Sequence, residues 1–287
     1  MTLQIDTLPE LRQLLAEQRH RRRTIGLVPT MGNLHAGHAS LVSAAKSQCD
    51  YVVTSIFVNP LQFGPNEDFA RYPRTLAADK AALAQAGCDA VFTPAVSALY
   101  PTGLEQQTRI SVPYLSSLYC GKTRPGHFDG VCTIVCKLFN MSQPDVAYFG
   151  LKDFQQFFLI SRMVADLQLP LRLAGLPTVR EASGLALSSR NGYLNAEQRA
   201  QAAAIYATLQ QVAQRIQVGE RDFLQLERLA LARLEAAGLR PDYFQVVDRH
   251  SLLPAQAHSH QLVLLAAAYA GTTRLIDNVT VETPLAG

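Results

Sequence analysis

The chain has little net charge, no long apolar run and no Cys-x-x-Cys pair, and each of these absences argues against one class of protein. Its formal net charge is +3 over 287 residues, which is too slight to indicate nucleic-acid binding. The longest apolar stretch, residues 262–270, is too short to cross a bilayer and predicts a core strand. The first residues are polar and carry no apolar signal region. We therefore expect a cytoplasmic protein with no nucleic-acid partner and no membrane partner.

The five cysteines, Cys49, Cys88, Cys120, Cys132 and Cys136, also fit no disulfide framework and no zinc site. Their number is odd, and no two of them form a Cys-x-x-Cys pair. Cys132 and Cys136 are four residues apart and would share one face of a helix. Small buried hydrophobic side chains are the favoured interpretation, and metal binding is the minor alternative.

The remaining composition is that of a globular protein with alternating strands and helices in its first part. Hydrophobic residues make up 48% of the chain and charged residues 17%. Apolar patterning predicts strands at 24–28, 51–58, 90–93, 145–149 and 171–173, and helices at 38–48, 75–86, within 128–141 and at 153–167. Apolar strands separated by helices are typical of a parallel sheet covered on both faces, so we expect an α/β fold.

After about residue 177 the pattern changes. Two helical stretches are followed by three strand-like runs, without alternation: helices at 196–218 and 221–237, then strands at 242–247, 262–269 and 273–281. This order indicates a smaller α+β unit. The predicted domains are therefore residues 1–177 and 178–287.

A phosphate site is expected where the chain leaves the first of the predicted strands. It passes Pro29, turns at Gly32 and enters a helix near Gly37. The first amides of a helix are unpaired and carry partial positive charge, so this end suits phosphate. His35 and His38 are three residues apart, and each imidazole could donate a hydrogen bond to a phosphate oxygen. The alternative is a loop with two incidental histidines, but the strand–turn–helix context favours the site.

This His-x-Gly-His element resembles the signature of a nucleotidyltransferase superfamily that attacks the α-phosphate of a nucleoside triphosphate. The segment after the next strand offers Asn59 and Gln62, neutral groups that suit a hydroxylated acid. More motif blocks follow at residues 64–69, 71–75, 126–131, 144–156, 180–181, 187–191 and 274–278. In order and spacing, the set resembles the pantothenate synthetase family over nearly the whole chain.

The resemblance implies a Rossmann-like N-terminal domain and a smaller C-terminal domain that closes over the nucleotide. It implies a magnesium-dependent reaction of ATP, pantoate and β-alanine that gives pantothenate, AMP and pyrophosphate. The carboxylate of pantoate would first form an adenylate, and the amine of β-alanine would then displace AMP. Since displacement at phosphorus leaves little covalent work for side chains, the enzyme should act by alignment and charge stabilisation. The family also implies a homodimer.

The same resemblance assigns roles to individual residues. The ATP-binding residues would be Met31, His35, His38, Gly150, Lys152, Asp153, Val179, Leu187, Ser188, Ser189 and Arg190. The catalytic groups among them would be His35, His38, Lys152 and Arg190. Pantoate would be bound by Gln62, Gln156 and Asn59, and magnesium by Asp79. The roles of Arg124 and His127, which flank the site in the motif, are left open.

Two positions depart from the family pattern. Leu187 stands where members often have methionine, and Ala78 stands where some have a second carboxylate beside the one at Asp79. Two rival functions follow from the motifs. An adenylyl- or cytidylyltransferase would share the histidines but would not need Gln62 and Gln156 around an acid pocket. A non-catalytic nucleotide-binding module would need neither Lys152 nor the motif at 188–190.

Overall fold

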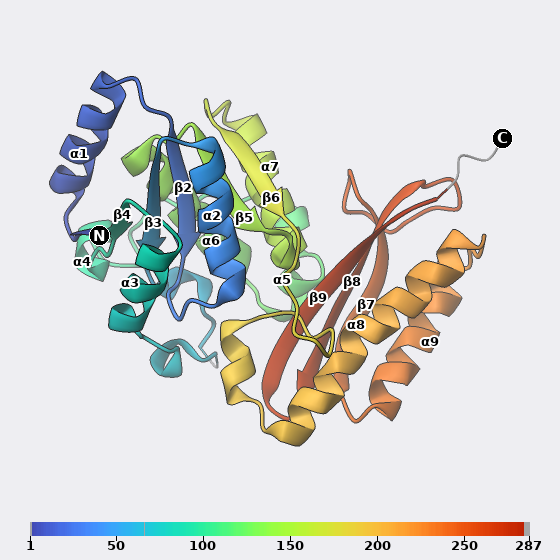
Figure 1. The fold of residues 1–287 in the computed structure, drawn as a ribbon. Coiled ribbons are helices and arrows are strands. Elements are labelled where there is room, and N and C mark those ends of the chain that lie inside the picture. Colours follow the sequence, from blue (N-terminus) through green and yellow to red (C-terminus); the bar gives the residue numbers. More distant parts are fainter. Residues whose placement is uncertain (1, 66, 284–287) are drawn as a thin grey trace. The chain divides into compact units, whose positions relative to one another are not determined.

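The computed structural model describes residues 2–65 and 67–283, and they form two compact units (Figure 1). The first unit comprises Met1–Leu151 and Gln156–Pro177, and the second comprises Lys152–Gln155 and Thr178–Gly287. The main break thus falls at the position where the sequence pattern changes, but Lys152–Gln155 groups with the second unit. Whether the two units behave as separate domains stays a prediction.

The first unit is built on a six-stranded sheet with the order β1-β4-β3-β2-β5-β6. All of its strand pairs are parallel. The strands are β1 (Leu3–Ile5), β2 (Ile25–Thr30), β3 (Tyr51–Ile56), β4 (Ala90–Phe92), β5 (Val146–Gly150) and β6 (Arg172–Leu176). The predicted α/β class is confirmed. The short strand β1 was not predicted, because three residues with mixed burial give no readable period.

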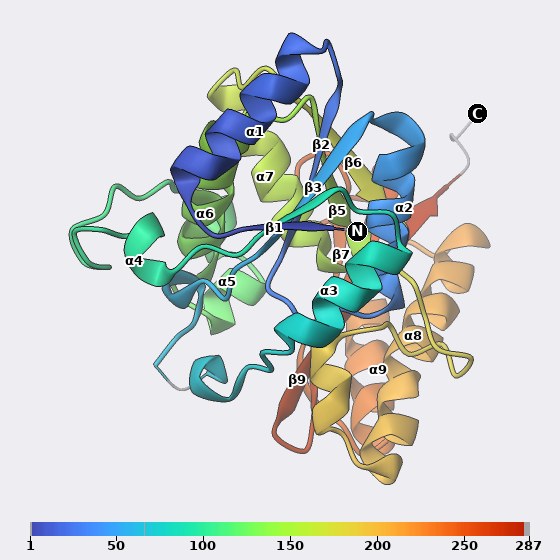
Figure 2. The same cartoon turned by 60° about the vertical axis from the view of Figure 1, so that its left-hand side comes forward.

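Helices cover both faces of this sheet (Figure 2). The longer ones are α1 (Leu8–His20), α2 (Ala36–Gln48), α3 (Leu76–Gln85), α6 (His127–Ser142) and α7 (Phe154–Asp166). The short helical segments are η1 (Pro60–Gln62), η2 (Phe69–Arg71), α4 (Val96–Leu99), η3 (Leu115–Ser117), α5 (Cys120–Thr123) and η4 (Leu151–Asp153). Because side chains alternate along a strand, Val28 on β2 joins the core under α2 and α3, which also includes Leu41, Leu83 and Tyr148. Helices α1 and α6 pack against each other and against β2.

The strand order places a topological switch point between β2 and β5. From β2 the chain proceeds to β3 and β4 on one side, and it later returns to β5 and β6 on the other. Open parallel sheets bind ligands in the crevice at the carboxyl ends of the strands beside such a point. The β2–α2 turn and Gly150, the last residue of β5, therefore border the expected site.

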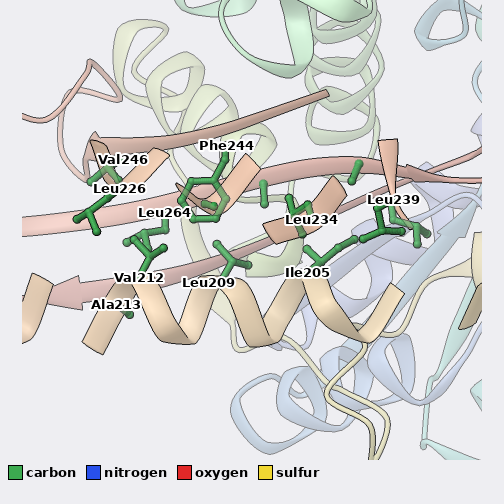
Figure 3. Packing of buried hydrophobic residues seen from close by; sticks show 14 of the residues in the cluster. Ile205, Leu209, Val212, Ala213, Leu226, Leu234, Leu239, Phe244, Val246 and Leu264 are labelled. Carbon is green, nitrogen blue, oxygen red and sulfur yellow. The ribbon is translucent and has the colours of Figure 1, made fainter. Parts of the chain in front are cut away.

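The second unit is an antiparallel sheet covered by two helices. Its strands β7 (Arg240–Asp248), β8 (Gln261–Ala270) and β9 (Thr273–Glu282) lie in sequence order. Helix α8 (Ala196–Gln217) packs on β8 and β9, and α9 (Phe223–Ala236) packs on β7 and against α8. Figure 3 shows the core between them, where Leu209 and Val212 of α8 face Phe244 and Leu264 of the sheet. The short helix η5 (Ser189–Tyr193) precedes α8.

Two smaller expectations can be compared with the described residues. All five cysteines are buried and free, as expected for small hydrophobic side chains. Within residues 2–65 and 67–283, no helix is both long and apolar enough to cross a membrane.

Candidate active site

The turn between β2 and α2 carries both predicted imidazoles, and each ring is held by a backbone hydrogen bond. His35 is the N-cap of α2, and its Nδ1 accepts from the N–H of Gly37 at 3.1 Å. His38 reaches back, and its Nδ1 accepts from the N–H of His35 at 3.3 Å. This is a reciprocal capping box built from two histidines. The ring centroids lie 4.2 Å apart.

These caps decide which nitrogen of each imidazole carries the proton. A backbone N–H can only donate, so Nδ1 is the acceptor in both rings and the proton of the neutral form resides on Nε2. Both side chains are half-buried at the positive end of α2. The arrangement suits donation from Nε2–H to an anionic oxygen, which is the chemistry that the sequence pattern predicted.

Asp79, the predicted magnesium ligand, lies in the first turn of α3 and is 2% exposed. Its Oδ2 accepts from the N–H of Asn33 at 3.1 Å, and its Oδ1 accepts from the N–H of Leu34 at 2.8 Å. The Thr75 hydroxyl donates to Oδ1 at 3.1 Å. Both carboxylate oxygens are thus used by the turn that precedes His35.

Asn59 and Gln62, the predicted pantoate ligands, lie at η1 and differ in what they can offer a substrate. Asn59 is 1% exposed, and its Nδ2 donates to Gln62 Oε1 at 3.1 Å and to the carbonyl of Gly130 at 3.0 Å. Its Oδ1 accepts from the Tyr100 hydroxyl at 2.7 Å and from the N–H of Leu61 at 3.3 Å. Its amide is therefore fully engaged. Asn59 supports Gln62 in this structure, and direct contact with pantoate, as predicted from the motif, stays a prediction.

The support from Asn59 fixes the orientation of the Gln62 amide. Since Asn59 donates to Gln62 Oε1, the Gln62 NH2 group is the end that points away, and it contacts Met31 Sδ at 3.0 Å. An NH2 group can only donate, so Gln62 suits an oxygen acceptor such as a carboxylate. A Cβ on Gly130 would lie 2.3 Å from the carbonyl oxygen of Leu61, so only glycine allows this approach of α6 to η1.

Arg124 and His127 form a network that holds the backbone of Gln62. Arg124 donates to Glu67 Oε2 at 2.7 Å and lies 2.9 Å from His127 Nε2. Because arginine can only donate, His127 Nε2 is the acceptor, and its Nδ1 donates to the Gln62 carbonyl at 2.8 Å. Burial raises the pKa of Glu67, but Arg124, the backbone N–H hydrogen bond within residues 64–67 and the nearby His127 together lower it by more, so the net pKa is below its ordinary value.

In the second unit, Lys152 follows β5 and is anchored through its main chain. The Asn278 side chain on β9 donates to the Lys152 carbonyl at 2.9 Å. Asn278 itself donates its backbone N–H to Asp277 Oδ1 at 2.8 Å, and Arg180 donates to both oxygens of Asp277. Burial raises the pKa of Asp277, and Arg180 opposes this shift. The Lys152 ammonium lies 3.8 Å from the Asp153 carboxylate.

The motif at 187–191 is held by backbone contacts. The N–H of Leu187 donates to the Val179 carbonyl at 2.9 Å. Ser188 caps η5, and its hydroxyl accepts from the N–H of Arg190 at 3.2 Å. Asn191 is buried and donates to the Ala186 carbonyl at 3.0 Å. Ser189 and Arg190 are half-buried within η5.

The remaining predicted residues lie at the ends of elements. Gly150 ends β5, and a Cβ added there would meet no atom within 4 Å. Gln156 is half-buried on α7. Within the first unit, the structure brings together Met31, Asn59 and Gln62, and it links Asp79 to the turn of His35 and His38. Within the second unit, it joins Val179 to Leu187.

Four supporting residues had no predicted role. Tyr100, Thr75, Asn278 and Asp277 each contact a predicted site residue or its anchor. Asn278 and Asp277 belong to the motif at 274–278, so a signal existed there without an assigned role. Thr75 likewise ends the motif at 71–75 and had no assigned role, whereas Tyr100 lies outside every motif, and a lone tyrosine gives no pattern.

Comparisons with known proteins agree with this geometry. A profile of the family described as Pantoate-beta-alanine ligase matches residues 4–280. A pantothenate synthetase of Pseudomonas putida (strain W619) is 57% identical over 278 residues, which is 97% of this chain and 97% of that protein. One from Pseudomonas aeruginosa (strain UCBPP-PA14) is also 57% identical, over 97% of this chain and 98% of that protein.

Solved structures give the same answer for the fold. The crystal structure of pantothenate synthetase from Thermus thermophilus superposes with a TM-score of 0.90 at 43% identity, covering 97% of this chain and 99% of that one. A pantoate-beta-alanine ligase from Francisella tularensis, complexed with beta-gamma ATP and beta-alanine, has a TM-score of 0.82 at 34% identity and covers 97% of each chain. The chain therefore belongs to the pantoate–β-alanine ligase family, and it is a ligase that joins pantoate to β-alanine.

Proposed function

We propose that this ligase uses ATP to form a pantoyl adenylate. His35 and His38 donate hydrogen bonds to the ATP phosphates while pyrophosphate is displaced at the α-phosphorus. In the first step, a pantoate carboxylate oxygen attacks the α-phosphorus and pyrophosphate leaves. In the second step, the neutral amine of β-alanine attacks the acyl carbon, AMP leaves and the amine loses a proton. The products are pantothenate, AMP and pyrophosphate.

The observation that carries this proposal is the double imidazole cap of α2. Both Nδ1 atoms accept from backbone N–H groups, so both rings keep the Nε2–H tautomer without help from a substrate. A donor that is already oriented loses little freedom when charge develops on a phosphate oxygen, which is the basis of electrostatic stabilisation of a transition state. The helix N-terminus adds partial positive charge at the same place.

For pantoate, we assign the carboxylate and hydroxyl groups to Gln62 and Gln156. The Gln62 amide is turned so that its NH2 group is available as a donor, which matches an acid and not an ammonium group. Asn59 then has the task of holding that orientation. The Arg124–His127 network holds the Gln62 backbone from another side.

Further ATP contacts are assigned by the family resemblance, namely Met31, Gly150, Lys152, Asp153, Val179, Leu187, Ser188, Ser189 and Arg190. A flexible lysine ammonium can follow charge on a transferred phosphate, and an arginine can bind two phosphate oxygens at once. Asn278 fixes the Lys152 main chain, from which the side chain extends, and this supports contact of the Lys152 ammonium with the ATP phosphates.

Magnesium is proposed to arrive with ATP, since this ion keeps several waters and is commonly held by substrate phosphates. The described residues contain no group of three or more His, Cys, Asp or Glu side chains able to hold a metal ion. Asp79 does not fit as a direct ligand, because its carboxylate is 2% exposed and already accepts three hydrogen bonds. On the family resemblance, we also propose a cytoplasmic homodimer.

The decisive assay separates the adenylation step from the complete reaction. With ATP and pantoate alone, the enzyme should exchange labelled pyrophosphate into ATP, and adding β-alanine should yield pantothenate and AMP in equal amounts. Exchange that strictly requires β-alanine would exclude a separate adenylate.

Two variants test the assigned phosphate donors. Lys152→Ala and His38→Ala should each slow adenylate formation by about a hundredfold or more, the scale for removal of one oriented donor. His38→Gln is the matched control for the cap, because glutamine at this helix position can still accept from the N-cap amide. A rate near that of the parent enzyme in His38→Gln would assign His38 to capping alone.

A further inference from the structure

The feature that points beyond the assigned site residues is a buried carboxylate facing the phosphate-binding turn. Asp79 projects from α3 toward residues 32–34, and its two oxygens accept from the consecutive amides of Asn33 and Leu34. The Thr75 hydroxyl completes the set. These contacts join α3 to the turn between β2 and α2, two elements that are 45 residues apart along the chain.

The backbone of this turn explains why it needs an anion. Gly32 has a φ of +82° and Asn33 a φ of +50°, so two successive residues adopt the left-handed conformation. Successive N–H groups in such a turn converge and form a concavity that binds an anion. Here the anion is part of the protein, since Asp79 occupies the position that a phosphate oxygen takes in other turns of this kind.

The same geometry argues against magnesium at Asp79. Magnesium requires ligand oxygens at about 2.0–2.1 Å in an octahedral shell that usually includes several waters. The Asp79 side chain is 2% exposed, and its oxygens face two backbone donors and a hydroxyl. Space for a hydrated ion would require these three hydrogen bonds to break. Moreover, a cation placed there would face N–H groups, whose hydrogens carry partial positive charge.

The anchor acts on the imidazoles through the chain. Leu34, which donates to Asp79, directly precedes His35, the N-cap of α2. The N–H of His35 in turn holds His38 Nδ1. A shift of the turn therefore moves both rings and weakens both caps. Misplacement of a catalytic group by about 1 Å can cost about a hundredfold in rate.

We propose that Asp79 is a positioning residue that holds the β2–α2 turn, and with it His35 and His38, and that it is not a magnesium ligand. The inference rests on the proposed role of the two imidazoles at the ATP phosphates. It replaces the metal-binding role that the motif suggested for Asp79.

The first test needs no substrate. In the enzyme without ATP and magnesium, hydrogen exchange at the Asn33 and Leu34 amides should be slow, because both donate to a buried carboxylate. In Asp79→Asn, the side-chain NH2 group must face one of these amides, so at least one should exchange roughly tenfold faster or more. Free exchange of both amides in the parent enzyme would overturn the anchor, whether or not the enzyme makes an adenylate.

The second test separates positioning from metal binding. Asp79→Asn should slow adenylate formation by about 10- to 100-fold, while the magnesium concentration for half-maximal rate at fixed ATP changes less than about twofold. A tenfold rise in that concentration would overturn the proposal and restore the metal-ligand role. If Asp79→Asn does not fold, Thr75→Val serves in its place, since it removes one of the three hydrogen bonds and keeps the shape. It should slow the step severalfold, again with an unchanged magnesium titration.

A matched control shows whether any lost carboxylate would have the same effect. Asp89 is another partly buried aspartate that accepts a backbone N–H, that of Val52 at 2.7 Å, but it precedes β4 at the amino ends of the strands. Asp89→Asn should lower thermal stability and leave the rate of adenylate formation within about twofold. In Asp79→Asn, nitrogen NMR of the histidines should also show a mixture of tautomers that Asp89→Asn lacks. Equal rate losses in the two variants would reduce Asp79 to a general structural role.

Discussion

Replacing Tyr100 by phenylalanine tests whether pantoate recognition depends on the support behind Gln62. The Tyr100 hydroxyl donates to Asn59 Oδ1 at 2.7 Å, and both residues are almost fully buried. Burial raises the pKa of Tyr100 well above its ordinary value, so the hydroxyl remains a donor at any working pH. The change to phenylalanine removes one oxygen atom and keeps the ring, which lies 5.0 Å from Lys137 Nζ.

The size of the stability loss depends on the hydrogen bonds that Asn59 retains in the variant. One hydrogen bond contributes about 0.5–1.5 kcal/mol, and loss of all partners of a buried group costs more. Asn59 Oδ1 retains the N–H of Leu61 at 3.3 Å, so it is not orphaned and we expect a loss of stability of about 1 kcal/mol. A flipped Asn59 amide would oppose the Gln62 Oε1 and Gly130 oxygens with its own, so the Gln62 orientation should loosen but not invert.

We therefore expect Tyr100→Phe to raise the KM for pantoate about three- to tenfold, with kcat within about threefold and the KM for ATP unchanged. About 1.4 kcal/mol corresponds to a factor of ten, so a loss of about 1 kcal/mol in the free energy of pantoate binding corresponds to a KM increase within this range. Steady-state kinetics with each substrate varied, together with urea unfolding, measures both quantities. Tyr148→Phe is the control, because it also removes a buried hydroxyl but one that donates to Gln48 at 3.2 Å. If both variants lose stability and neither changes the KM for pantoate, the link from Tyr100 through Asn59 to Gln62 is refuted.

Three further predictions concern other anchors. Asn278→Ala removes the donor to the Lys152 carbonyl and should slow adenylate formation about tenfold in single-turnover kinetics; an unchanged rate would contradict the anchoring role. Glu67 has a net pKa below its ordinary 4.5, so its pair with Arg124 stabilises the fold above that value and this stabilisation is lost as pH falls through the lower folded pKa. Glu67→Gln should thus lower the Tm at pH 7 more than it lowers the Tm near pH 3. Equal decreases in Tm at the two pH values would refute this. Leu187→Met should change the ATP KM less than tenfold. The backbone hydrogen bond to Val179 does not depend on the side chain, and Leu–Met exchanges usually cost under about 1.5 kcal/mol. A hundredfold gain in the rate of adenylate formation would show that the leucine impairs the site.

Local sequence signals predicted most of the fold. The alternation of apolar strands with helices predicted the parallel sheet, and the change of pattern near residue 177 predicted the α+β unit, whose strands the structure shows to be antiparallel. Both signals depend only on neighbouring residues, because strand and helix periods appear within a short window. The strand order and the pairing of β1 with β4 did not follow from the sequence, since they depend on contacts between segments that are far apart.

The turn of His35 and His38 shows how far a motif leads. Strand, turn and helix were all predicted from residues 24–48, and so was a donor role for the imidazoles. The reciprocal caps that fix the tautomers are also local, and a histidine in a capping position could have suggested them. Serine, threonine, aspartate and asparagine are the usual caps, however, so a histidine cap is not a familiar signal.

The long-range contacts that hold the site in place were what sequence reasoning missed, even where it had singled out the residue, and the reason is physical. Asp79 reaches the turn across 45 residues, Tyr100 reaches Asn59 across 41, and Asn278 reaches Lys152 across 126. The family resemblance singled out Asp79, and Asn278 lies in the motif at 274–278, but the partner of each is too far along the chain for a local pattern to reveal it. Tyr100 had no sequence signal. The motif instead suggested the role that a carboxylate has most often near ATP, which is metal binding. Since a buried carboxylate between two backbone amides satisfies a different need, only the folded geometry separates the two roles. A positioning group should therefore be recognised by its partners in the folded structure, because its own sequence context does not identify its role. The comparison of Asp79→Asn with Asp89→Asn tests this general statement as well as the role of Asp79.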